Sequence, residues 1–176
     1  MSRYYLISSL PMLSLEQTPG ITAEAFLAAC RAQLGQADAD AAEALMTGAP
    51  SAHPFAAAWR DKDTVLRNAV AKARARAAGT DAAQWLRQAQ GCDAQIERLA
   101  EDALQQPDPI RQERALDKAR WLAAEELQGH DPMGAGVPLA YAVKLALALR
   151  WAALDAARGQ ATFDALARLP DGLVAD

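Results

Sequence analysis

The stretch that decides the fold is residues 54–79, PFAAAWRDKDTVLRNAVAKARARAAG. Its apolar side chains recur at alternating spacings of three and four, which places them on one face of an α-helix. Pro54 suits the first turn of a helix, and Gly79 suits a helix end. We therefore expect a helix over residues 55–78, the longest in the first half of the chain.

The rest of the sequence extends this helical signal. Alanine makes up about a quarter of the 176 residues, and alanine has the highest helix propensity. Valine, isoleucine, tyrosine and phenylalanine, which favour strands, are scarce after residue 13. We expect a mainly α-helical fold, an irregular bundle of about six or seven helices. Residues 1–176 form one helical domain in this interpretation, with a possible subdivision near residues 107–109.

Capping residues and apolar spacing place the other helices. Residues 4–13 differ, because this aromatic-led segment predicts a short N-terminal strand or extended segment with no targeting signal before it. The region 129–136 reads as the longest flexible loop. The expected helices are 22–35, 38–46, one from 80 that is interrupted at 91 and continues to 106, 110–127, 138–158, and a short one from 162.

Charge and cysteine content narrow the class of protein. A net charge of −4 gives no general attraction to nucleic acid. Cys30 and Cys92 lack metal-type spacing, so we expect buried free thiols, which fit a cytoplasmic protein. The best membrane candidate, residues 139–149, is too short and contains Lys144. We expect no membrane insertion, although peripheral contact with the inner membrane stays open.

The sequence carries no recognisable catalytic motif. The nucleophile elbow, the phosphate-binding loop and the HExxH zinc motif are all absent. The two histidines, His53 and His130, fall in expected loops and have no second histidine at helical spacing. The pair His130 and Asp131 is more typical of a helix end than of a metal site. We therefore expect no catalytic residue, no cofactor and no metal.

Basic residues between 67 and 76 and the four tryptophans are the candidate binding features. Arg67 and Arg74 are seven positions apart and share one helix face, which suits an acidic partner. The alternative is a solvated face balanced by nearby aspartates. Most of the tryptophans should lie in the core, and an exposed one would indicate a binding surface. The tryptophans are Trp59, Trp85, Trp121 and Trp151.

Three segments, WRDKDTVLRNA at 59–69, LDKARW at 116–121 and LAYAVKL at 139–145, point to a family. Together with YYL at 4–6 and SLP at 9–11, they resemble the DUF2764 family of uncharacterised bacterial proteins. The genes of that family often occur in operons for V-type ATP synthases. The resemblance spans nearly the whole chain, and the order and spacing of the segments carry it.

The resemblance implies an accessory or stalk-type subunit of a V-type ATPase, without catalytic activity. It also suggests a shortened relative of the helical socket protein that joins the central stalk to the membrane ring and is about twice as long. The family has no assigned catalytic residues, so the resemblance supplies only candidate positions for partner binding or a buried polar network. These positions are Arg67, Asn68, Arg74, Arg120, Trp121, Tyr141 and Lys144.

Some of these positions have an alternative, structural interpretation. Arg67 and Arg120 would then be internal salt-bridge partners. Lys144, beside the apolar stripe of its helix, would direct its amine to a carboxylate such as Glu125 or Asp117, or would simply extend to solvent from the edge of the core.

A second function from another class also stays open. In this hypothesis the chain is a free-standing helical protein with a small-molecule pocket, with or without enzymatic activity. Convergent polar groups in a concave pocket would favour it, whereas an exposed apolar patch rimmed by arginine would favour protein contacts. The pocket would involve Tyr141, Lys144, Arg120 and His130.

Overall fold

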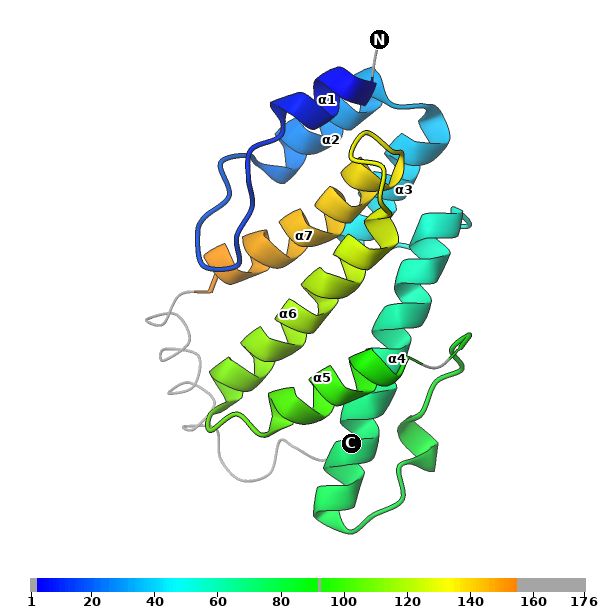
Figure 1. The fold of residues 1–176 in the computed structure, drawn as a ribbon, viewed down its shortest axis with the longest axis vertical. Helices are drawn as coiled ribbons and strands as arrows, with labels where there is room; N and C mark the ends of the chain where they lie inside the picture. The colour runs from blue at the N-terminus through cyan, green and yellow to red at the C-terminus, as the bar shows by residue number, and fades with distance from the viewer. Residues whose placement is uncertain (1–2, 92, 155–176) are drawn as a thin grey trace, which may run out of the picture.

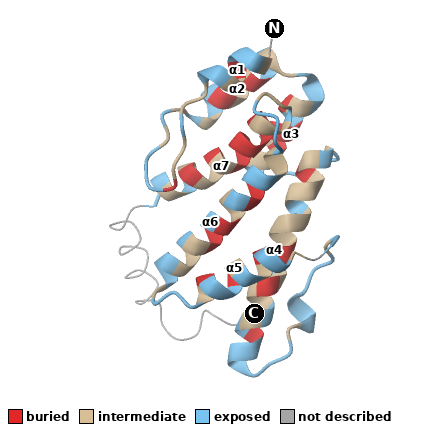
Figure 2. Cartoon of the chain, in the orientation of Figure 1, coloured by how far each residue is buried: buried red, intermediate tan, exposed pale blue. Residues whose placement is uncertain are grey.

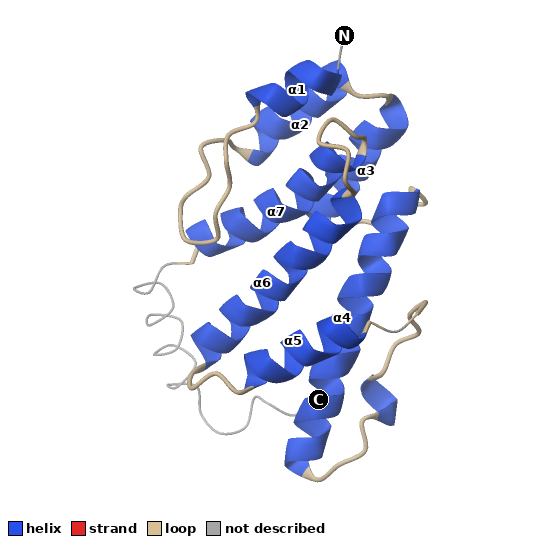
Figure 3. Cartoon of the chain, viewed as in Figure 1, coloured by secondary structure: helices blue, strands red, loops and turns tan. Residues whose placement is uncertain are grey.

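The computed structural model describes residues 3–91 and 93–154. Within these ranges the regular structure is helical, with seven α-helices, one short 3-10 turn and no strand (Figures 1 and 3). The expected mainly helical fold is confirmed. The helices are α1 (Arg3–Ser9), α2 (Ala23–Gln33), α3 (Gln36–Thr47), α4 (Pro54–Ala78), α5 (Ala94–Leu104), α6 (Pro109–Gln128) and α7 (Gly136–Ala152), and the turn is η1 (Ala83–Trp85).

The expected N-terminal strand is wrong, because residues 3–9 form helix α1. Leu6 is fully buried in this helix, whereas Tyr4 and Tyr5 are mostly exposed. The aromatic residues that suggest a strand therefore do not pack in the core, and the packing of Leu6 against α2 and α7 outweighs their strand propensity. Residues 10–14 follow without regular secondary structure.

One apolar core lies where α1, α2, α3 and α7 meet, in the upper part of Figure 1. Phe26 of α2 is its largest fully buried side chain, and its ring centroid lies 5.2 Å from that of Tyr141. Cys30 is a buried free thiol in this core, as expected, and burial raises its pKa to about 12. The thiol of Cys30 therefore stays protonated and unreactive at neutral pH. Cys92 lies outside the described residues.

A second apolar core fills the space between α4, α5 and α6, and the buried positions of both cores face inward in Figure 2. A small contact of Ala124, Ala140 and Val143 joins α6 to α7 between the two cores. The proline-rich break at 107–109 connects α5 to α6, and these two helices pack against each other. Among the described residues, no helix combines the length and the hydropathy that a bilayer crossing needs.

Helix α4 has the bounds that its sequence predicts. His53 caps its start, because the ring Nδ1 accepts a hydrogen bond from the backbone N–H of Phe55 at 3.2 Å. Gly79 ends the helix with a φ of 67°, a conformation that glycine adopts without strain. The hydrogen bond also fixes the tautomer, since an accepting Nδ1 leaves the proton on Nε2, which lies 3.1 Å from Asp38.

The helix expected from residue 80 is wrong in its first part. Of the described residues between α4 and α5, only those of η1 are helical, and Trp85 and Leu86 are exposed, so they supply no buried apolar face. Instead, Asn68 on α4 holds this connection. Its Nδ2 donates to the carbonyl oxygen of Arg87 at 2.8 Å, and its Oδ1 accepts from the Arg87 N–H at 2.9 Å.

Helix α7 begins at Gly136 and ends at Ala152, before the expected end near residue 158. The short helix expected from residue 162 lies outside the described residues. Gly136 packs directly on the end of α6. A Cβ atom added there would lie 2.6 Å from the carbonyl oxygen of Gln128 and 3.1 Å from its carbonyl carbon.

Gly136→Ala is expected to lower the free energy of unfolding by about 1–3 kcal/mol, the usual cost of overpacking. The start of α7 must move away from the backbone of α6 to admit the methyl group. Urea denaturation followed by circular dichroism measures the loss. Gly20→Ala is the control, since its Cβ would meet Pro11 at an ordinary 3.8 Å. Equal unfolding midpoints for the two variants would contradict the prediction.

Candidate functional site

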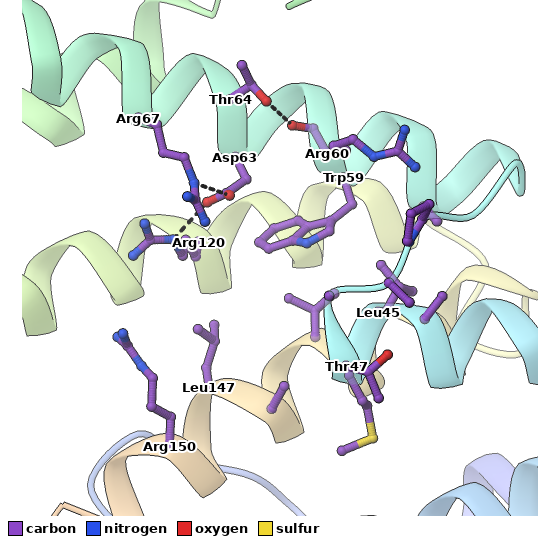
Figure 4. A pocket seen from close by; sticks show the side chains of 18 of the residues that line it. Leu45, Thr47, Trp59, Arg60, Asp63, Thr64, Arg67, Arg120, Leu147 and Arg150 are labelled. Carbon is purple, nitrogen blue, oxygen red and sulfur yellow. Dashed lines mark hydrogen bonds and ion pairs between the residues drawn. The ribbon is translucent and has the colours of Figure 1, made fainter. Parts of the chain in front are cut away.

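A cleft of about 890 Å³ opens between the end of α3, helix α4, and the facing sides of α6 and α7 (Figure 4). We call it the arginine cleft. Its charged lining residues are Arg60, Asp63, Arg67, Arg87, Asp117, Arg120 and Arg150. Its main apolar lining residues are Leu45, Met46, Trp59, Val143 and Leu147.

Asp117 of α6 is the buried centre of the charged network and has no exposed surface. Its Oδ1 accepts from Arg120 Nη1 at 2.8 Å. Its Oδ2 accepts from the indole Nε1 of Trp151 at 2.7 Å and from Nη2 of Arg150. Trp151 and Arg150 both belong to α7, so this carboxylate connects α6 to α7. A buried carboxylate requires such partners.

Arg120 extends the network from α6 to α4. Its Nε donates to Asp63 Oδ1 at 2.9 Å, and Arg67 Nε donates to the other oxygen, Oδ2, at 2.6 Å. Only 17% of the Arg120 side chain is exposed. The expected salt bridges of Arg67 and Arg120 are therefore confirmed, although only Arg120 is internal, since the Arg67 side chain is 55% exposed.

Burial and ion pairing act in opposite directions on the pKa values of Arg120 and Arg150. Burial alone would lower the pKa of Arg120, but hydrogen bonds and charges of Asp63 and Asp117 outweigh it, so the pKa rises. Burial likewise opposes the charge of Arg150, and Asp117 and Glu113 raise its pKa overall. Both guanidinium groups are permanent cations in the cleft.

Tyr141 lies away from the cleft, in the first core. Its hydroxyl donates to the carbonyl oxygen of Pro11 at 3.0 Å, and burial raises its pKa to about 12. This hydrogen bond fastens the segment after α1 onto α7. The geometry thus gives Tyr141 a structural role.

Lys144 and Trp121 form a separate group with Glu125 on the surfaces of α6 and α7. Lys144 Nζ lies 3.4 Å from Glu125 Oε1 and 5.3 Å from the ring centroid of Trp121. The indole of Trp121 donates to the same oxygen at 3.0 Å. The expected pairing of Lys144 with Glu125 is confirmed, and the alternative, Asp117, is wrong because its oxygens already bind other donors.

The basic face of α4 has partners that differ in part from those expected. Lys72 lies 3.7 Å from Glu97, and Arg76 lies 3.5 Å from Glu101, so α5 supplies acids in place of the nearby aspartates. Arg74 is exposed and has no ion pair among the described residues.

The residue set expected for a small-molecule pocket does not converge. Of its members, Arg120 alone lines the cleft, and His130 is an exposed loop residue. Nor does any group of three metal-ligating side chains gather within the part of the chain that the structure describes.

Sequence reasoning missed Arg60, Arg87 and Arg150 as lining residues. A signal did exist on α6, where Glu113, Asp117 and Arg120 recur at spacings of four and three and share one helix face. Arg87 gave no such signal, because its place depends on the irregular connection that Asn68 holds.

The lining of the cleft offers mainly charged and apolar groups. Its lining supplies guanidinium groups, two carboxylates and apolar surface, and it includes no serine, cysteine or histidine. The hydroxyl of Thr64 already donates to the backbone oxygen of Arg60 at 2.7 Å. Comparison of the chain with protein-family models, with curated proteins and with solved structures finds no match in any of the three.

Proposed function

We propose that this protein is a non-catalytic accessory subunit that acts through protein–protein contacts. The observation that carries the proposal is the exposure of Trp85 and Leu86, at 52% and 39%. We call these two residues the Trp85 surface. Trp59, Trp121 and Trp151 are each more enclosed than Trp85. Tryptophan is among the commonest anchors of protein interfaces, so its exposure favours a binding role.

The Trp85 surface is also held in place before any partner binds. The two hydrogen bonds between Asn68 and the Arg87 backbone fix the chain directly after Leu86 to α4. Such preorganisation reduces the entropy that binding would otherwise cost. Arg74, on the same helix as Asn68, adds an exposed cation with no ion pair in the described structure. An apolar partner surface with acidic residues complements these groups.

The resemblance to the DUF2764 family suggests the partner, a component of a V-type ATPase or ATP synthase. We propose a stalk or assembly role at the cytoplasmic side of that complex, with peripheral contact at the inner membrane. The packing of α4 against α5 and α6 supports a binding scaffold of this kind, since it gives the Trp85 surface a fixed base.

Trp85→Ala is expected to remove most of the recovered partner. Truncation of an interface tryptophan costs about 2 kcal/mol or more, which weakens a complex roughly 30-fold. The tagged full-length protein would be purified from its own host in gentle detergent, and co-eluting proteins would be quantified by mass spectrometry. Wild-type protein should recover ATPase subunits in near-equal amounts, and Arg74→Glu should recover less while its helicity stays unchanged.

Ile110→Ala is the matched control, because Ile110 is another strongly exposed apolar side chain on a different helix. It should leave the recovery unchanged. A clean monomer from the wild-type purification would refute the accessory-subunit proposal, and equal recovery with Trp85→Ala would refute the role of the Trp85 surface.

A further inference from the structure

The arginine cleft holds hydrogen-bond donors that the fold does not use. Arg67 binds Asp63 through Nε alone, so its two terminal nitrogens have no acceptor among the described residues. Arg150 uses only Nη2, and the guanidinium of Arg87 makes no hydrogen bond or ion pair in the described structure. Figure 4 shows Arg67, Arg120 and Arg150 arriving from three different helices around one end of the cavity.

The charge of the cleft is opposite to that of the chain. Five arginines and two aspartates line it, an excess of three positive charges. Glu113, which lies 3.0 Å from Arg150, reduces the excess to two. The whole chain carries a net charge of −4. Positive charge concentrated in a concave surface attracts anions more strongly than the same charge spread over an open face.

A purely structural role does not account for this excess. Asp117 and Asp63 are the acids that need compensation, and Arg120 contacts both of them. The side chains of Arg67 and Arg150 are 55% and 46% exposed, so their cost of burial is small and their free nitrogens remain accessible. Arg87 contributes a further cation without pairing to any acid in the described structure.

The apolar side of the cleft narrows the choice of ligand. Trp59 and Leu147 lie beside the arginine end, and Leu45 lies further along the cavity (Figure 4). Small-molecule sites combine mostly apolar walls with a few placed polar groups, in volumes of about 300–1,000 Å³. The volume and lining of the cleft fit that description.

We infer that the arginine cleft binds a small organic anion, with a phosphate or carboxylate group attached to an apolar or aromatic body. The planar guanidinium fork matches the oxygens of either oxyanion in a bidentate manner. Arg67, Arg87 and Arg150 supply the donors, and Trp59 and Leu147 pack against the apolar body. The lining of the site includes neither Trp85 nor Leu86, and Arg87 follows Leu86 directly in the chain.

Isothermal titration calorimetry of the full-length protein at low salt tests the inference. The probes are phenyl phosphate, phenylacetate, inorganic phosphate and the neutral analogue benzyl alcohol. At least one of the two aromatic anions should bind more tightly than inorganic phosphate and benzyl alcohol. The relative affinities of phenyl phosphate and phenylacetate show whether the cleft prefers a phosphate or a carboxylate group. Higher ionic strength should weaken binding because salt screens the exposed charges.

Arg67→Gln and Arg87→Gln identify the residues involved. Each should weaken binding of the better aromatic anion about tenfold, the usual effect of losing one charge-assisted hydrogen bond. Neither substitution removes a partner of Asp117, and urea denaturation would verify that both variants fold. Arg74→Gln is the matched control on the same helix as Arg67, outside the cleft, and should bind like wild type.

Three results would overturn the inference: no binding of either aromatic anion at millimolar concentration, equal affinity for benzyl alcohol, or the same loss in Arg74→Gln as in Arg67→Gln. Trp85→Ala should leave anion binding intact, so failure of the protein-contact proposal and failure of this one are distinguishable.

Discussion

Asp117→Ala is expected to lower the free energy of unfolding by about 3–5 kcal/mol, as removal of one partner from a buried ion pair usually does. The substitution leaves Arg120, whose side chain is only 17% exposed, with Asp63 at 2.9 Å and Glu113 at 3.9 Å as its carboxylate partners. It also leaves the indole N–H of Trp151 without its acceptor. The cost therefore comes from the groups that stay behind rather than from the aspartate itself.

Urea denaturation followed by circular dichroism measures this loss. Asp102→Ala is the control, because Asp102 is an exposed helical acid without an ion pair in the described structure, and its change should stay within about 0.5 kcal/mol. Asp117→Asn, which keeps an acceptor but removes the charge, should fall between the two. A loss below about 1 kcal/mol for Asp117→Ala would show that the network rearranges at little cost.

Phe26→Ala is expected to cost about 3–5 kcal/mol, the range for deletion of a buried phenylalanine side chain. Phe26, on α2, has no exposed surface. It packs against α7, where its ring centroid lies 5.2 Å from that of Tyr141. Its neighbours are buried and come from several helices, so they cannot close the cavity without moving α1 or α7.

The same denaturation experiment tests this prediction. Phe26→Leu should lower the free energy of unfolding by distinctly less, because leucine fills most of the space that phenylalanine occupies. Leu122→Ala, at a partly exposed site on α6, should change stability only slightly. If Phe26→Ala and Leu122→Ala lost equal stability, the first core would not be the tightly packed unit that the structure describes.

Local signals explain why the helices are predictable. The bounds of α4 follow from Pro54, from Gly79 and from the three-four spacing between them, all of which lie within the helix or at its ends. Helix α6 likewise begins after Asp108, whose side chain accepts from the Arg111 N–H at 2.8 Å. Features that depend on residues near in sequence can be read from the sequence.

The predictions from sequence are wrong where contacts between residues far apart in the chain determine the local structure. The segment led by Tyr4 and Tyr5 resembles a strand because both residues favour strands, but only Leu6 is buried and a helix presents it to the core. Trp85 is exposed although tryptophan is usually an enclosed residue, because the short turn η1 that carries it has no buried residue.

The candidate site is predictable only in part for the same reason. Arg67 and Arg120 are identified correctly as salt-bridge partners, and helical spacing could have supplied Asp63 for Arg67 and Asp117 for Arg120. The bond from Arg120 to Asp63 joins two helices and could not be assigned in that way. Arg150 lies 33 positions from Asp117, and only the antiparallel arrangement of α6 and α7 brings them together. A cleft made of side chains from separate segments of the chain has no signature in any one of them.

The buried carboxylate of Asp117 also bears on how α6 and α7 choose their mutual register. Small side chains lie where the two helices meet, with Ala124 on α6 against Ala140 on α7, so this part of the contact is smooth. Smooth surfaces permit axial slippage, because a shift of one turn, about 5.4 Å, changes the apolar contact little. Such a shift would carry Arg150 and Trp151 away from Asp117 and leave it buried without their hydrogen bonds. A single buried polar residue thus favours one alignment of α6 and α7 at the part of their contact where alanine supplies little register.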